Sequence, residues 1–291
     1  MAHQHTPRHP RPVAIVTGAA TGIGRAIAAE LAGAGFTVVG TSRKPAAAGA
    51  GGGVLLELDV TDDASVRALV EQVLERYGRI DVLVNNAGLG LAAPAEESSV
   101  AQARELFEVN VFGVLRMTAA VAPHMRAAGS GRIITVSSAL GVIPAPFMAL
   151  YAATKHAVEG YSESLDHELR TRGVRAVLVE PAYVRSGFEA NSLAGDTPLA
   201  TYDDDRRVAL DGIAAAMRSA DEPDVVAEVV RIAATVDRPR VRYTAGRTAA
   251  AAALLRRLAP ASVFDAQIRK INGLPPAKPA RRRGAARRME L

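Results

Sequence analysis

The chain has 291 residues, of which 49% are hydrophobic and 22% charged, so it is long enough for one large α/β domain or two small ones with a well-filled core. It contains no cysteine, which excludes disulfides, thiolate metal sites and cysteine nucleophiles. Residues 278–291 hold six basic side chains and one acid and account for the whole net charge of +5, so the fold itself is formally neutral and is not expected to bind nucleic acid.

Residues 1–11 form a Pro- and His-rich leader without the apolar core of a secretory signal, and we expect this leader to be flexible. No apolar run in the sequence reaches the roughly 18 residues of a membrane span, so a cytoplasmic protein is expected. The three histidines outside the leader form no HxxxH pair, and no metal site is predicted.

Two hydrophobic patterns alternate along the chain. Short apolar runs rich in β-branched residues predict seven buried strands, at residues 13–17, 37–40, 54–58, 80–84, 132–136, 174–179 and 241–244. Helical spacing predicts helices at residues 23–34, 64–77, 100–125, 151–172 and 224–236. We therefore predict one doubly wound Rossmann-type α/β domain over residues 12–274, with a mostly parallel seven-stranded sheet and helices on both faces.

Two segments interrupt this alternation. Residues 183–220 show no clear period and follow the sixth strand. Because ligands bind outside the carboxyl ends of the strands in open parallel sheets, we expect this segment to be an irregular substrate lid. Residues 275–291 are rich in Pro, Ala and Arg, and we expect them to be a disordered basic tail.

A glycine-rich turn with GxxxGxG spacing joins the first strand to the first helix. Glycines let a pyrophosphate approach the backbone, and the N-terminus of the helix attracts its negative charge. Tight packing of the helix on the strand is the alternative reason for the glycines, but the strand–turn–helix context favours a dinucleotide. The predicted contacts are Gly18, Thr21, Gly22, Ile23 and Gly24.

The end of the second strand bears on the choice of cofactor. Ser42 stands where an acid would bind the ribose 2′-OH of NAD, and Arg43 follows it. A guanidinium would pair with the 2′-phosphate of NADP, so NADP(H) is predicted. Arg43 as a solvated loop charge is the alternative reading, and it keeps NAD(H) open.

Tyr151 and Lys155 open the helix predicted at residues 151–172 and share one of its faces, because they are four residues apart. A phenol has a pKa of about 10, and a neighbouring cation favours its phenolate form. We therefore expect Lys155 to lower the pKa of Tyr151, and Tyr151 to act as a general acid or base.

These motifs, together with Asn85-Asn86-Ala87-Gly88, Asn110 and Ser137-Ser138, resemble the short-chain dehydrogenase/reductase family over residues 12–260. The resemblance implies that Ser138 orients the substrate oxygen and that Lys155 binds the nicotinamide ribose. It also implies that Asn110 holds a water linking Lys155 to solvent. The catalytic set is then Asn110, Ser138, Tyr151 and Lys155.

The same resemblance extends the cofactor site. It assigns to the cofactor Asp59, Val60, Asn86, Ala87, Gly88, Tyr151, Lys155, Val184 and Ser186. The chain departs from the family pattern at Thr21, where many NADP-dependent members have a basic residue. It also departs at Ala182 and Ser186, which replace the usual glycine and threonine.

Residues 40–45, 109–113 and 159–164 are similar to the family members related to 17-beta-hydroxysteroid and retinol dehydrogenases. This implies an apolar ketone or secondary alcohol as substrate. Six apolar side chains between Ser138 and Tyr151 are consistent with an apolar substrate, although about half of them are equally well explained as residues of the hydrophobic core. They are Leu140, Val142, Ile143, Phe147, Met148 and Leu150.

The leading interpretation is an NADP(H)-dependent oxidoreductase that acts on a small apolar carbonyl or alcohol. One alternative is a redox-silent NADP(H)-binding regulatory protein on the same fold. Another is a nucleic-acid or membrane-surface protein recruited by the basic tail. The presence of Ser138, Tyr151 and Lys155 together favours the enzyme. By the same resemblance, the helices at 100–125 and 151–172 are expected to pair in a homodimer or homotetramer.

Overall fold

A computed structural model describes residues 11–45, 53–188 and 192–274. The apolar runs form one seven-stranded sheet with the order β3-β2-β1-β4-β5-β6-β7, and every neighbouring pair is parallel. The strands are β1 (Val13–Val16), β2 (Thr37–Ser42), β3 (Val54–Glu57), β4 (Val82–Asn85), β5 (Gly131–Val136), β6 (Val174–Pro181) and β7 (Arg242–Ala245). The predicted doubly wound parallel sheet is confirmed.

Five helices cover this sheet, four of them at the positions that the periodicity predicts apart from small shifts at their ends, while α4 (Gly113–Ala128) begins well inside the helix predicted at 100–125. They are α1 (Gly22–Gly33), α2 (Asp63–Tyr77), α4 (Gly113–Ala128), α5 (Ala149–Leu169) and α7 (Pro223–Thr235). The residues at the two ends of α2 explain where this helix begins and ends. Asp62 caps the N-terminus by accepting from the N–H groups of Ala64 and Ser65, and Gly78 ends the helix with a φ of 72°.

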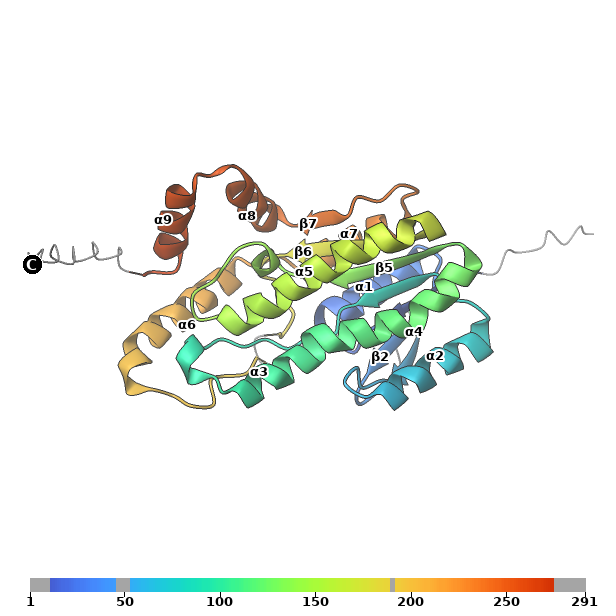
Figure 1. The fold of residues 1–291 in the computed structure, drawn as a ribbon, viewed down its shortest axis with the longest axis horizontal. Coiled ribbons are helices and arrows are strands. Elements are labelled where there is room, and N and C mark those ends of the chain that lie inside the picture. The colour runs from blue at the N-terminus through green and yellow to red at the C-terminus, as the bar shows by residue number, and fades with distance from the viewer. Residues whose placement is uncertain (1–10, 46–52, 189–191, 275–291) are drawn as a thin grey trace, which may run out of the picture.

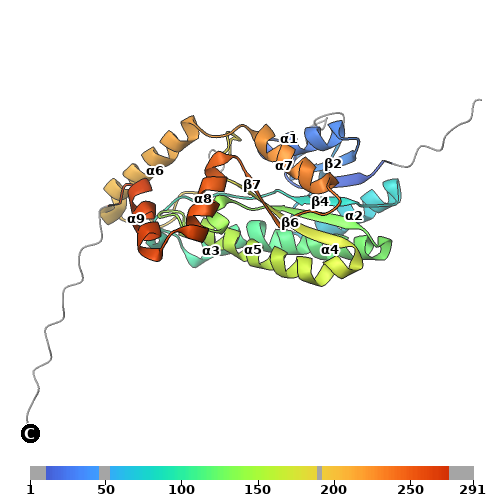
Figure 2. The ribbon, with the colours of Figure 1, turned by 90° about the horizontal axis from the view of Figure 1, so that it is seen from above.

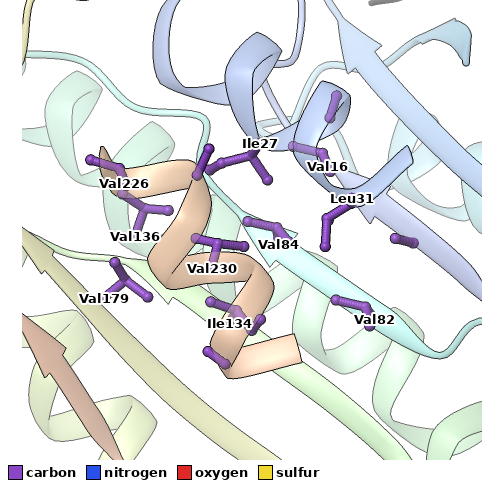
Figure 3. Close-up of a cluster of buried hydrophobic side chains, with 14 of the residues drawn as sticks. Val16, Ile27, Leu31, Val82, Val84, Ile134, Val136, Val179, Val226 and Val230 are labelled. Carbon is purple, nitrogen blue, oxygen red and sulfur yellow. The ribbon is translucent and has the colours of Figure 1, made fainter. Parts of the chain in front are cut away.

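The strands bury both faces because their residues alternate between two cores. Ala14 and Val16 of β1 face α1 and α7, whereas Val13 and Ile15 face α2, α4 and α5. Figures 1 and 2 show the helices on the two sides of the sheet. Figure 3 shows Val226 and Val230 of α7 packed with Ile27 of α1 over the strands of the first core.

The strand order reverses between β1 and β4, because the chain runs outward through β2 and β3 and then returns to the other side of β1. A crevice forms at such a switch point, outside the carboxyl ends of the strands. Thr17, Asn86 and Ser137 directly follow β1, β4 and β5. The topology therefore brings the glycine-rich turn and the later motifs to one edge of the sheet.

Three parts of the structure differ from the sequence prediction. The helix predicted at 100–125 is divided into α3 (Val100–Phe107), a π-helical turn η3 (Glu108–Phe112) and α4. The segment at 183–220 is not irregular throughout, since α6 (Asp203–Arg218) occupies its second half. Two further helices, α8 (Arg247–Leu258) and α9 (Ala261–Ile271), were not predicted.

Residues 1–10 of the leader and the basic tail at 275–291 lie outside the described residues. Within the described ranges, the stretch Val100–Ala128 is long and apolar enough to cross a membrane by length and composition, because an 18-residue window in it has a mean hydropathy of 1.3. A buried helix of a folded core passes the same test, and Met117, Val121 and Met125 of this stretch are fully buried against the sheet.

Candidate active site

The glycine-rich turn packs so closely that side chains would not fit at its centre. Gly22 has a φ of +53°, and a Cβ there would lie 2.6 Å from the carbonyl oxygen of Ser186. A Cβ at Gly24 would lie 2.2 Å from the carbonyl oxygen of Gly18. The first turn of α1 has no capping side chain and no acid, so its N–H groups can bind an anion.

The loop after β4 is joined to this turn by hydrogen bonds that the sequence analysis did not predict. The side-chain amide of Asn86 donates to the carbonyl oxygen of Thr17 at 2.9 Å. The Thr17 hydroxyl in turn accepts from the backbone N–H groups of Asn86 and Ala87, at 2.9 and 3.0 Å. Thr17 is therefore a structural part of the site, although only the motif at 85–88 carried a recognisable signal.

The adenosine end of the site is polar and partly basic. β2 ends at Ser42, and the exposed Arg43 follows at the rim of the cavity. Hydrogen bonds from the backbone and hydroxyl of Thr61 hold the pKa of Asp59 below its ordinary value, and Arg43 contributes to the same shift. Arg43 and Asp59 thus lie near each other, and an anionic group bound there would meet a guanidinium.

Ser138, Tyr151 and Lys155 meet beyond the end of β5. The Ser138 hydroxyl accepts from the backbone N–H of Leu140 at 3.1 Å and is hydrogen bonded to Tyr151. Tyr151 lies in the first turn of α5, and the Lys155 Nζ is 5.7 Å from the centre of its ring. Lys155 is held in place because its ammonium donates to the carbonyl oxygen of Val136 at 3.0 Å.

In the protein chain alone the pKa of Tyr151 is raised, whereas the lowering expected from the sequence depends on an oxidised nicotinamide as well as on Lys155. Burial raises the pKa of Tyr151 to about 12, and the hydrogen bond from Ser138 offsets only part of this shift. Burial also lowers the pKa of Lys155 to about 8, while the nearby Glu159 carboxyl acts in the opposite direction. Tyr151 therefore stays a neutral phenol at pH 7, the form that can donate a proton.

Asn110 lies in the π-helical turn η3, which points its buried amide toward the loop after β4. The Asn110 amide donates to the carbonyl oxygen of Leu89 at 2.8 Å and to the Thr154 hydroxyl at 3.2 Å. Its oxygen accepts from the N–H of Leu89 at 2.8 Å. Asn110 thus contacts the neighbour of Lys155 rather than the cavity, and its water-binding role stays a prediction.

One cavity of about 1400 Å³ connects these parts. Every residue assigned to the cofactor from the sequence borders it, including Val184 and Ser186 beyond β6. Ser138 borders it as well, and of the predicted substrate wall Leu140, Ile143 and Met148 do so. The other three wall residues, Val142, Phe147 and Leu150, do not line the cavity.

The segment predicted as a lid also borders this cavity. Phe188 stacks at an angle on Tyr151, with the ring centres 5.8 Å apart. Arg206 of α6 forms an ion pair with the buried Glu97, whose carboxylate also accepts from the N–H of Leu199 at 3.0 Å. These contacts tie residues 199–206 to the loop after β4.

The sequence analysis did not predict a partly buried ionic cluster that includes Glu159, one helical turn after Lys155. Arg242 of β7 pairs with Glu159 and Glu163 of α5 and with Glu180 of β6. Burial raises the pKa of Glu159 to about 7, although Ser137 and Arg242 act against this shift. No local motif marks this cluster, because its members come from three elements far apart in the sequence.

No three His, Asp or Glu side chains gather as metal ligands in the part of the chain that the structure describes. The residues present do fit a dinucleotide. They combine a glycine turn that excludes side chains, an open helix N-terminus and a cavity reaching Tyr151.

The family model described as short chain dehydrogenase matches residues 12–196, more than half of the chain. The chain belongs to the short-chain dehydrogenase family. An uncharacterised oxidoreductase of Schizosaccharomyces pombe is 34% identical over 221 residues, which cover 76% of this chain and 93% of that protein. A 3-ketodihydrosphingosine reductase of Bacteroides thetaiotaomicron is 41% identical over 179 residues, 62% of this chain and 66% of that reductase, which is just under two thirds of its length.

Solved structures of short-chain dehydrogenases share the fold. One from Streptomyces avermitilis has a TM-score of 0.78 and 30% identity, and the match covers 90% of this chain and 96% of that one. A metagenomic short-chain oxidoreductase in complex with NADP scores 0.63 at 32% identity, covering 80% and 96%. A Burkholderia phymatum enzyme in complex with NAD scores 0.73 at 28% identity, covering 93% and 98%. As a family member, this chain is an oxidoreductase of CH–OH and C=O groups that uses a nicotinamide cofactor.

Proposed function

We propose that this short-chain dehydrogenase uses NADP(H) to interconvert an apolar ketone and its secondary alcohol, with Tyr151 as the general acid or base. The observation that carries the proposal is the shared cavity. Ser138, Tyr151 and Lys155 border the same space as the glycine-rich turn, so a dinucleotide bound at the turn reaches the three side chains. Such positioning is the larger part of catalysis when the cofactor carries the redox chemistry.

The nicotinamide, when bound, supplies or accepts the hydride. The chain provides the proton and the orientation. In the reducing direction the Ser138 hydroxyl orients the carbonyl oxygen, and the neutral Tyr151 phenol donates its proton to that oxygen. Lys155, whose ammonium donates to the carbonyl oxygen of Val136, is proposed to bind the ribose, and Asn110 is proposed to hold a water that returns protons to Lys155.

Arg43 supports NADP(H) over NAD(H). It follows β2 directly, and Ser42 leaves no carboxylate to repel a 2′-phosphate or to bind a free 2′-OH. The NADP complex of the metagenomic relative agrees with this choice, whereas the Burkholderia enzyme in complex with NAD shows that the fold accepts either cofactor.

An apolar substrate is supported by the wall that faces Tyr151. Leu140, Ile143 and Met148 line the same cavity, and the Phe188 ring packs at an angle against the Tyr151 ring. The 3-ketodihydrosphingosine reductase among the relatives reduces a ketone, as its name says. No feature of the described site favours a redox-silent regulatory protein.

A panel of ketones and secondary alcohols with NADPH and NADH tests this function. We expect turnover with NADPH on apolar ketones, and a fall of about 10²–10⁴-fold in Tyr151→Phe, because general acid catalysis contributes that factor. The Phe variant keeps the ring, so NADPH binding measured by fluorescence should be unchanged. Near-normal turnover of the Phe variant would show that the proton comes from another group.

A further inference from the structure

The cavity does not end at the catalytic side chains. It continues between three helices that lie beyond residue 196, where the match to the family model ends. Figure 2 shows α6, α8 and α9 gathered at the same end of the molecule. A Cβ on Gly273, just after α9, would lie 3.2 Å from the Val208 side chain of α6, so the end of α9 lies near α6. The apolar lining from these helices includes Leu210, Ile213, Ala251, Ala252, Leu255, Ile268 and Ile271.

This extension offers little to a polar ligand. Arg206 is the charged side chain of α6 that borders it, and its guanidinium is already paired with Glu97 and Asp203. The amide of Asn272 donates to the carbonyl oxygen of Ile268 at 2.8 Å. Thr248 of α8 adds one hydroxyl to this lining. A charged or sugar-like group placed here would lose its water and gain few partners in return.

The three helices also lack the packing that normally covers apolar side chains. α6 buries no residue, α8 buries only Ala249 and α9 buries only Phe264. Leu210 and Ile271, which face the cavity, remain 46% and 71% exposed. An apolar ligand between the helices would remove this surface from water.

We propose that this space is a channel for the long alkyl or acyl chain of the substrate, which runs from Tyr151 between α6 and the α8–α9 pair. The proposed channel depends on the proposed function and limits the substrates of that function to long-chain ketones and their alcohols. A flexible chain fits better than a compact ring system, because the cavity continues from Tyr151 to three successive helices and its α8 side is lined by the small Ala251 and Ala252.

A series of 2-alkanones from five to thirteen carbons tests the channel. With NADPH, kcat/KM should rise about fourfold for each methylene until the chain reaches the end of the channel, because each buried methylene contributes roughly that factor. Ala252→Phe narrows the channel and should lower kcat/KM by tenfold or more for 2-tridecanone while leaving 2-pentanone unchanged. Ala250→Phe, on the same helix but outside the cavity, is the matched control.

A second variant keeps the test independent of how α8 packs. Leu210→Asp places a carboxylate in the channel from α6, and Ala214→Asp places it on an exposed position of the same helix outside the cavity. We expect the first to lose activity on long ketones and the second to retain it. Equal kcat/KM for all chain lengths, an equal loss at all lengths in the channel variants, or a preference for a fused-ring ketone would overturn the channel.

Calorimetric titration with 2-tridecanol and 2-pentanol separates this inference from the proposed function. The channel requires that the longer alcohol bind more tightly to the full-length protein, and that Ala252→Phe remove the difference. Length-dependent binding without any turnover would retain the channel and refute the enzyme function. Turnover of short ketones without length-dependent binding would retain the enzyme function and refute the channel.

Discussion

Tyr151 and Lys155 are both buried, and burial disfavours the charged form of each side chain. With its pKa raised to about 12, Tyr151 is a phenol throughout the range in which proteins are usually assayed. In the proposed mechanism, reduction uses that phenol as the proton donor and oxidation uses the phenolate as the proton acceptor. The two directions of the reaction should therefore depend on pH in different ways.

We predict that alcohol oxidation rises about tenfold per pH unit from pH 7 to pH 10, since the phenolate fraction grows by that factor below its pKa. Ketone reduction should not fall through the loss of the Tyr151 proton in this range. Initial rates in both directions, with NADP⁺ and NADPH, measure this difference. A steep rise that persists in Tyr151→Phe would assign the titration to another group.

Arg43 is the residue that we propose selects the cofactor. We predict that the double variant Ser42→Asp with Arg43→Ala shifts preference from NADPH toward NADH, because the new carboxylate repels a 2′-phosphate and can bind a 2′-OH. A charge-assisted hydrogen bond contributes about 1.5–3 kcal/mol, so NADPH affinity should fall tenfold or more. Kd values for both cofactors give the ratio. If the ratio of the two Kd values is unchanged, another part of the protein binds the 2′-phosphate. Lys44→Ala serves as the control for a general loss of positive charge.

At the scale of elements, Arg242 connects α5, β6 and β7 through three carboxylates. Glu159 has a folded-state pKa of about 7 against an ordinary value of 4.5, because burial outweighs the stabilising Arg242. The folded protein therefore keeps a proton that the unfolded chain releases between these two values. The contribution of Glu159 to stability is present below about pH 4.5 and is lost as the pH rises toward 7.

Replacing this carboxyl should remove that pH dependence. We predict that raising the pH from 5 to 8 lowers the melting temperature of Glu159→Gln less than that of the wild type. The difference corresponds to a free energy of unfolding on the order of 3 kcal/mol. Glu163→Gln is the matched control, because Arg242 holds the pKa of Glu163 below its ordinary value and this carboxyl titrates at lower pH. If the melting temperatures of Glu159→Gln and of the wild type change equally between pH 5 and pH 8, the raised pKa of Glu159 is wrong.

At the scale of the whole molecule, the outer faces of α5 and of the η3–α4 segment share a small apolar cluster. Val111, Val114 and Val158 are buried in it, and Phe112 beside them is 43% exposed. Exposed apolar surface of this kind is often covered by another subunit.

We predict a homodimer or homotetramer through this face. Light scattering should give two or four times the chain mass of 30.4 kDa. Phe112→Glu should lower that mass, because it would bury a charge at the interface. Val263→Glu on the exposed surface of α9 should not. A monomeric wild type would refute the prediction.

The sequence alone determined the sheet, its direction and most of the site. Strand periodicity and β-branched runs are local signals, and they predicted all seven strands. The turn from Gly18 to Gly24 and the pair Tyr151 and Lys155 were likewise recognisable, because the chemistry requires fixed residue types at short spacings. Gly18, Gly22, Gly24, Tyr151 and Lys155 all border the cavity, and their roles stay predictions.

Only the tertiary structure decided the rest. The π-helical turn around Asn110, the Arg242 cluster and the rise in the Tyr151 pKa depend on packing between distant elements. α8 carries an Ala- and Leu-rich run that helix propensity alone could have identified, but the run does not show that this helix lines a channel with α6 and α9. Burial is the common reason, because it sets charge, cavity shape and substrate access, and no short stretch of sequence encodes it.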